Sequence, residues 1–321
     1  KRQIERRRMM VKIKVILSAT GTAWGYLFKE EERIKELNRF KNSLENIKGE
    51  LPEDLELEVH SFKDIPEEIN FISSLTKEDF AIYVALCSGT PGLKILLEKD
   101  ISMVYYQQMY AGHTWSMNTL RKGNVLLFMG SSLDDLKRKI RILYTYKKIK
   151  QSKYVLVTKE ERNDIMERKN LLLEKFGFNG ELIKPEELLK YYQSISEKEA
   201  EKGAKEFINN SVGIIEPTYE EIVNAYRMYL GMEKLVMDKK ADGITVDCLA
   251  LFGMKKLPTY PCIGFTLLNN RGIPAACEGD VFSIFTMYIF KYLTGFPSFI
   301  SDPVMDISKN TIIHAHCVAP N

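Results

Sequence analysis

Two carboxylates stand two residues apart near the C-terminal end of the sequence, at Glu278 and Asp280. On a strand both side chains would project from the same face, because side chains alternate along a strand. Neighbouring carboxylates repel each other unless a proton or a cation lies between them. The pair therefore predicts a divalent metal site or, since an apolar helical segment follows at once, a helix that is simply capped by Asp280.

Two of the four histidines, His314 and His316, belong to the strand-like segment 311–317. Their spacing again places both side chains on one face of a strand. An imidazole beside the carboxylate pair would give a mixed oxygen and nitrogen site of the kind that suits Mn²⁺, Co²⁺ or Mg²⁺. Histidines that only satisfy polar groups of the core are the other interpretation, and the sequence leaves both open.

A third polar cluster follows a predicted strand in segment 105–116 and contains His113 and Trp115. Loops after strands are where α/β proteins hold their ligand contacts. Trp115 could stack on a sugar ring while His113 binds its hydroxyl groups. An aromatic subunit interface is the alternative.

The segments that must position these residues alternate between short apolar runs and amphipathic helices. In the first half of the chain, five strands separated by crossover helices favour a parallel, doubly wound sheet. The predicted strands are 13–17, 55–62, 80–86, 101–106 and 124–129, and the predicted helices are about 29–48, 65–74, 90–98 and 131–148.

The pattern restarts with a strand at 154–157, followed by strands at 181–183, 212–215 and 243–247. Capping-box sequences begin three of the helices between them, at Thr158, Ser196 and Thr218. We therefore expect an α/β protein with two Rossmann-like (flavodoxin-like) parallel-sheet domains, at 10–149 and 150–275. Residues 276–321 are expected to be the start of a longer, β-rich C-terminal catalytic domain.

The overall composition is that of a globular protein without a nucleic-acid-sized positive field, since 46 basic residues face 43 acidic ones. The longest nearly apolar run, 281–293, is too short to span a bilayer. The basic residues at the N-terminus are not followed by the apolar core of a signal peptide. Five scattered cysteines without a C-x-x-C motif indicate reduced thiols, so we expect a cytoplasmic protein. The charge balance and the short apolar run lead us to expect that it binds neither nucleic acid nor membrane.

Neither half of the chain has a glycine-rich phosphate-binding motif at a strand-to-helix turn, which disfavours a nucleotide-dependent oxidoreductase. Ser18, Thr20 and Thr22 follow the first predicted strand instead. Ligands of α/β sheets bind at the carboxyl ends of strands, so these hydroxyl groups either contact a sugar or merely end the strand.

The sequence resembles the L-fucose isomerase-like family of the L-fucose/L-arabinose isomerase superfamily. The resemblance is carried by "GIPAACEGDV" with its apolar helix, by "IIHAHCVAPN", by the loop "YAGHTWS" and by "IEPTYEEI". It implies aldose–ketose isomerisation with Mn²⁺, or with Co²⁺ or Mg²⁺. Proton transfer between C1 and C2 of the sugar would pass through an ene-diol.

The resemblance also implies roles for individual residues. Asp280 matches a metal-binding, base-like carboxylate, Glu278 would support it in catalysis, and His316 matches a metal-binding histidine. His113 and Trp115 match a substrate-binding loop that, in this family, reaches the active site of a neighbouring subunit. A homo-oligomer with a shared active site and a small sugar as substrate is therefore expected.

One position departs from the family pattern. The family's first metal-binding glutamate would fall at Leu267, and no acidic residue lies between Asp247 and Glu278. Loss of one of two catalytic carboxylates would weaken metal binding and proton transfer together. The alternative function is therefore a non-catalytic, sugar-binding or regulatory homologue.

Overall fold

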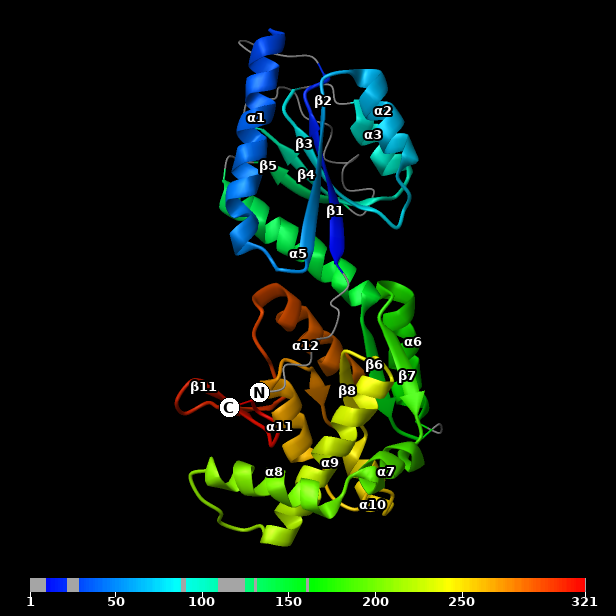
Figure 1. Ribbon diagram of the computed structural model, residues 1–321, viewed down its shortest axis with the longest axis vertical. Coiled ribbons are helices and arrows are strands. Elements are labelled where there is room, and N and C mark those ends of the chain that lie inside the picture. Colours follow the sequence, from blue (N-terminus) through cyan, green and yellow to red (C-terminus); the bar gives the residue numbers. More distant parts are fainter. Residues whose placement is uncertain are drawn as a thin grey trace. The chain divides into compact units, whose positions relative to one another are not determined.

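The computed structural model describes residues 10–21, 29–87, 91–108, 125–129, 132–159 and 162–320. The chain divides into two compact units, residues 1–147 and 148–321 (Figure 1). His113, Trp115 and Thr22 lie outside the described residues, so their predicted roles remain predictions. The predicted domain boundaries also remain predictions.

The first unit is built on a five-stranded parallel sheet with the order β2-β1-β3-β4-β5. This is the order of flavodoxin-like sheets, in which the chain reverses direction across the sheet between β1 and β3. The central strands are apolar throughout because helices cover both faces of the sheet. The strands are β1 (Val11–Ser18), β2 (Leu55–Phe62), β3 (Phe80–Ala85), β4 (Ser102–Gln107) and β5 (Val125–Met129).

Helices α2 and α3 lie side by side on one face of this sheet, and α1 lies on the other (Figure 1). Tyr105 belongs to the core under α2 and α3, whereas the next residue, Tyr106, packs on Phe40 of α1 with ring centroids 5.3 Å apart. The helices are α1 (Glu30–Ile47) with a short 3₁₀ turn at Lys48–Glu50, α2 (Ile65–Ser74), α3 (Pro91–Glu98) and α5 (Leu133–Gln151).

A fully buried carboxylate, Glu68 of α2, lies at the carboxyl end of β1. Its Oε2 accepts hydrogen bonds from the hydroxyl groups of Ser18, at 2.7 Å, and Thr20, and its Oε1 accepts one from Tyr83. The sequence predicted that Ser18 and Thr20 either contact a sugar or end the strand. In the structure, their hydroxyl groups hydrogen-bond a buried acid at the end of the strand.

The second unit has a four-stranded parallel sheet with the order β7-β6-β8-β9. The strands are β6 (Lys153–Val157), β7 (Asn179–Ile183), β8 (Gly243–Val246) and the short β9 (Ala275–Ala276). The predicted strand at 212–215 is wrong, because this segment is an irregular connection between two helices. Its Val212 and Ile215 are fully exposed and have no sheet neighbour to pair with.

Helices α7, α8 and α11 pack around α9, and α6 packs with α12. Two of the three predicted capping sequences are confirmed: Ser196 caps α8, and Thr218 forms a complete capping box with Glu221 at the start of α9. The helices are α6 (Asn163–Phe176), α7 (Pro185–Ser194), α8 (Glu197–Asn209), α9 (Tyr219–Asp238), α10 (Cys248–Gly253), α11 (Cys262–Asn270) and α12 (Val281–Thr294).

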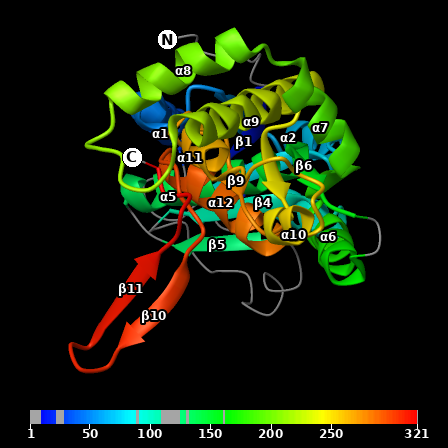
Figure 2. The ribbon, with the colours of Figure 1, turned by 90° about the horizontal axis from the view of Figure 1, so that it is seen from below.

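An antiparallel hairpin of β10 (Asp302–Asp306) and β11 (Thr311–Ala315) follows α12. It extends away from the helices of its unit (Figure 2), and the large side chains Met305 and Ile312 are mostly exposed. Two parallel-sheet units and a C-terminal antiparallel part confirm the predicted fold class. None of the helices in the described ranges is long and apolar enough to cross a membrane.

Candidate functional site

The carboxyl ends of β6, β8 and β9 form one edge of the second sheet, where Thr158, Asp247 and the turn after Ala276 meet. The chain reverses its direction across this sheet between β6 and β8, because β7 lies on one side of β6 and β8 lies on the other. Open α/β sheets bind their ligands at such a switch point. The edge is therefore where a ligand site is expected.

Residues 277–280 form a tight turn at this edge. The prediction of a strand through Glu278 and Asp280 is wrong, since β9 ends at Ala276 and both Glu278 and Gly279 have positive φ angles, 62° and 65°. The Gly279 N–H donates to the Val246 carbonyl at 3.0 Å, which holds the turn against the end of β8. A turn, rather than a pleated strand, thus sets where the Glu278 side chain lies.

The turn should tolerate no side chain at Gly279. A Cβ there would lie 2.9 Å from Ile165 Cδ1 and 3.2 Å from Asp247 Cβ, and φ is 65°. We expect Gly279→Ala to lower the free energy of unfolding by about 2–3 kcal/mol in urea denaturation. Gly272→Ala is the matched control, because its φ is 69° but nothing lies within 4 Å, so about 1 kcal/mol is expected. Equal losses in the two variants would show that the packing at Gly279 is unimportant.

Asp280 caps helix α12. Its Oδ1 accepts hydrogen bonds from the backbone N–H groups of Phe282 and Ser283, each at 3.0 Å, and its Oδ2 accepts the Ser283 hydroxyl group at 2.5 Å. These contacts are those of a helix cap, one of the two interpretations that the sequence allowed for Asp280. Both oxygens are engaged in the start of the helix, and Asp280 does not belong to the group of converging metal-type ligands found among the described residues.

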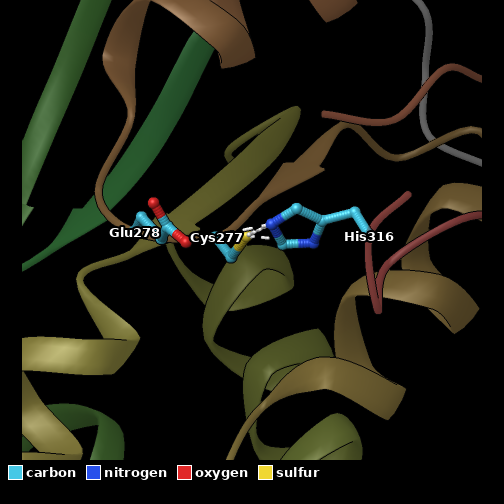
Figure 3. Close-up of side chains that lie close together, drawn as sticks. All are labelled: Cys277, Glu278 and His316. Carbon is cyan, nitrogen blue, oxygen red and sulfur yellow. Dashed lines mark hydrogen bonds and ion pairs between the residues drawn. The ribbon is translucent and has the colours of Figure 1, made fainter. Parts of the chain in front are cut away.

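The side chain of His316 lies beside Cys277 and Glu278, not beside Asp280 (Figure 3). The His316 Nε2 atom lies 3.5 Å from Cys277 Sγ and 3.8 Å from Glu278 Oε1. One potential ligand atom from each of the three residues lies within 4.8 Å of the others. The His316 side chain is 8% exposed and the Glu278 side chain 43%, so the imidazole is enclosed while the carboxylate faces solvent.

Two contacts hold His316 in this place. The buried Asn269 of α11 donates from Nδ2 to the carbonyls of Ala275, at 3.0 Å, and Val318, at 3.4 Å, which fastens the segment after β11 to the end of the sheet. The Cys317 N–H donates to His316 Nδ1 at 3.1 Å. His314, in contrast, lies on the exposed hairpin with its Nδ1 2.8 Å from the Ser301 hydroxyl group. The structure therefore separates the two histidines that the sequence placed on one face.

Four of the five cysteines gather around His316, which the sequence did not predict because they are far apart in the chain. Cys248 hydrogen-bonds Cys277, and this bond together with burial raises the pKa of Cys277. Cys262 and Cys317 have their Sγ atoms 3.4 Å apart. The hydrogen bond with Cys262, together with the neighbouring His316, lowers the pKa of Cys317 to about 6.

A buried acid, Asp247, completes this edge of the sheet. Its Oδ2 accepts the Thr158 hydroxyl group and the Arg162 Nη1 group, both at 2.9 Å. Thr158 was predicted to cap the next helix, but that helix begins at Asn163, and Thr158 bonds across the sheet instead. Such a contact between two strand ends leaves no local sequence signal, which is why Asp247 and Arg162 were missed.

The comparisons with known proteins bear on part of the chain. No protein-family model matches the sequence. A sulfoquinovose isomerase of Clostridium sp. (strain MSTE9) is 32% identical over 148 residues, which are 46% of this chain and 33% of that protein. Part of this chain is similar to a sugar isomerase. The match covers about a third of the length of that relative, and the resemblance to the L-fucose isomerase-like family stays a prediction.

The donor atoms of the cluster decide which ions it could take. The Glu278 carboxylate and the His316 imidazole are ligands that Mn²⁺ and Co²⁺ accept, whereas the Cys277 thiol suits softer ions. A set of oxygen, nitrogen and sulfur therefore fits Co²⁺ or Zn²⁺ better than Mn²⁺, and it fits Mg²⁺ poorly. A carboxylate and an imidazole side by side can also exchange a proton with a bound sugar.

Proposed function

We propose that this chain belongs to a sugar aldose–ketose isomerase whose chemistry takes place at the switch point of the second sheet. The partial similarity to a sulfoquinovose isomerase carries this proposal. The Cys277, Glu278 and His316 cluster at a ligand-binding edge of an α/β sheet supports it.

Aldose–ketose isomerisation moves one proton between C1 and C2 and a second one between the two oxygens. Glu278 is suited to accept and return the carbon-bound proton, because its carboxylate is exposed at the edge where a sugar would bind. His316 is suited to donate a hydrogen bond from Nε2 to a sugar oxygen, because its ring is enclosed and its Nδ1 accepts the Cys317 N–H. Asp280 would then support the site by fixing the turn before α12.

A divalent ion would be held by Glu278 and by His316 Nε2, with the ring proton moved to Nδ1 and the Cys317 N–H contact given up. Such an ion would polarise the sugar carbonyl and stabilise the charge of the ene-diol. Mn²⁺ is the ion that the family resemblance implies, with Co²⁺ and Mg²⁺ as alternatives, and the thiol of Cys277 favours Co²⁺ among them. His113 and Trp115 are proposed to bind the sugar, in a homo-oligomer whose active site is shared between subunits.

The activity is tested by loading the protein with Mn²⁺ or Co²⁺ and incubating it with a panel of aldoses that includes sulfoquinovose. The ketose is followed by NMR. We expect conversion of at least one aldose and its loss after treatment with a chelator. No conversion of any sugar by protein that has been supplied with each ion in turn would contradict the proposal.

Asp280→Asn distinguishes the two roles considered for Asp280. The asparagine keeps Oδ1 as an acceptor for the first N–H groups of α12, so a cap survives the change, whereas a metal-binding or proton-accepting carboxylate does not. We expect kcat/KM to stay within about threefold of wild type, and Asp280→Ala to cost about 1 kcal/mol of stability. A loss of kcat/KM of about 100-fold or more in Asp280→Asn would support the role of Asp280 as a metal ligand or proton acceptor.

The second candidate is a sugar-binding homologue without catalysis. Leu267, half-buried on α11, stands where the resemblance places a glutamate, and this observation favours it. In this case a sugar would raise the melting temperature of the protein, and the increase would survive both a chelator and the Glu278→Gln substitution. An increase that disappears with the chelator would instead favour the enzyme.

A further inference from the structure

Two cysteines that are 55 residues apart in the sequence lie in contact at the surface of the second unit. Cys262 is the first residue of α11, and Cys317 follows β11. Their Sγ atoms are 3.4 Å apart, Cys317 is exposed, and Cys262 is partly exposed. A disulfide requires the two sulfur atoms to approach from this distance to about 2.05 Å.

We propose that Cys262 and Cys317 are an oxidative modification site that forms a reversible disulfide. The Cys317 thiolate first attacks the oxidant and is oxidised. With a peroxide, the resulting sulfenic acid condenses with the Cys262 thiol and releases water. With a small disulfide, the Cys262 thiolate displaces the thiol from the mixed disulfide, so two thiols are released. In each case the two cysteines give up two electrons and two protons to the oxidant.

Burial selects this pair over the others. Cys277 and Cys248 also contact each other, but they are only 1% and 3% exposed, and Cys87 is 2% exposed in the other unit. An oxidant in solution must reach one thiol first, and Cys317 is the exposed one of the five. Cys262 is the cysteine whose sulfur contacts it, so the second step is local.

The new bond would tie the segment that carries His316 to α11. That segment is already held at Val318 by Asn269 of the same helix. The disulfide closes a long loop between α11 and the end of β11, which should stabilise the unit by restricting its unfolded chain. The part of this inference that concerns His316 rests on the proposed function, whereas the disulfide itself does not.

Peptide mapping tests the disulfide directly. Trypsin places each cysteine in its own peptide, with Cys262 in 257–271 and Cys317 in the peptide that begins at residue 310. The full chain is treated with hydrogen peroxide or with oxidised glutathione, the remaining thiols are blocked, and the digest is analysed by mass spectrometry. We expect the two peptides to be joined with the loss of two hydrogens, and to separate after addition of dithiothreitol.

Two variants and a melting curve complete the experiment. Cys317→Ser should abolish the joined peptide, whereas Cys87→Ser should leave it unchanged. Oxidation should raise the melting temperature by about 5–10 °C in wild type and not in Cys317→Ser. The proposal is overturned if Cys317 forms its disulfide with Cys277, or if it carries only glutathione or a higher oxide. It is also overturned if both Cys317 and Cys262 remain reduced thiols. None of these readouts depends on isomerase activity.

Discussion

Replacing His316 by alanine should lower kcat/KM for aldose–ketose conversion by about 100-fold or more, while the protein stays folded. The imidazole side chain is 8% exposed and lies 3.8 Å from the Glu278 carboxylate. Its loss removes a ligand or hydrogen-bond donor from the reacting oxygens, and positioned groups of this kind contribute about 10²–10⁴-fold. Steady-state rates on the best aldose of the panel measure the effect.

His314→Ala is the matched control for this experiment. His314 is two residues away in the sequence but lies on the exposed hairpin, bonded to Ser301. We expect its loss to change kcat/KM by less than about twofold, in line with ordinary surface substitutions. If the two alanine variants lose activity equally, or if His316→Ala is fully active, the cluster is not the site of catalysis.

Replacing Glu68 by alanine should lower the free energy of unfolding of the first unit by about 3–5 kcal/mol. Glu68 has no exposed surface and accepts hydrogen bonds from Ser18, Thr20 and Tyr83. Alanine leaves these three hydroxyl groups without their acceptor and opens a cavity, and both effects are costly in a buried site. The change is measured as a shift of the urea denaturation midpoint of this unit.

Glu67→Ala is the control for Glu68→Ala. Glu67 is the preceding residue of α2, and it is exposed. Its loss removes only one acidic residue from the first turn of the helix, which should cost less than about 1 kcal/mol. A loss below about 1 kcal/mol in Glu68→Ala would mean that the buried hydroxyl groups find other partners, and the account of the strand end would be wrong.

The sequence predicted those parts of the fold that depend on local patterns. The helix over 65–74 has its predicted bounds, and Ser196 and Thr218 begin helices as predicted, because a cap is a contact between residues close in the chain. Segment 212–215 has the composition of a strand, but a strand needs a neighbour in the sheet. Here α8 and α9 pack directly on each other, and β9 occupies the last place in the sheet.

The candidate site was predicted only in part, for the same reason. His316 and Glu278 were recognised from their side chains and their spacing, although their true arrangement depends on a turn with two positive φ angles. The contacts of Cys277 with His316 and of Asp247 with Thr158 join residues 39 and 89 positions apart. Contacts between residues so far apart in the sequence depend on the register of the sheet, which no local pattern of the sequence reveals.

The fate of the transferred proton tests the central proposal most directly. Metal-loaded protein is incubated with the best aldose in D₂O, and the ketose is examined by NMR for deuterium at C1. Because the Glu278 carboxylate is 43% exposed, its proton should exchange with solvent between the two transfer steps. We predict deuterium at C1 with wild-type protein, and about 100-fold slower formation of this ketose with His316→Ala. Absence of any ketose, or a ketose that retains its hydrogen completely, would contradict proton transfer by the solvent-exposed Glu278 at this site.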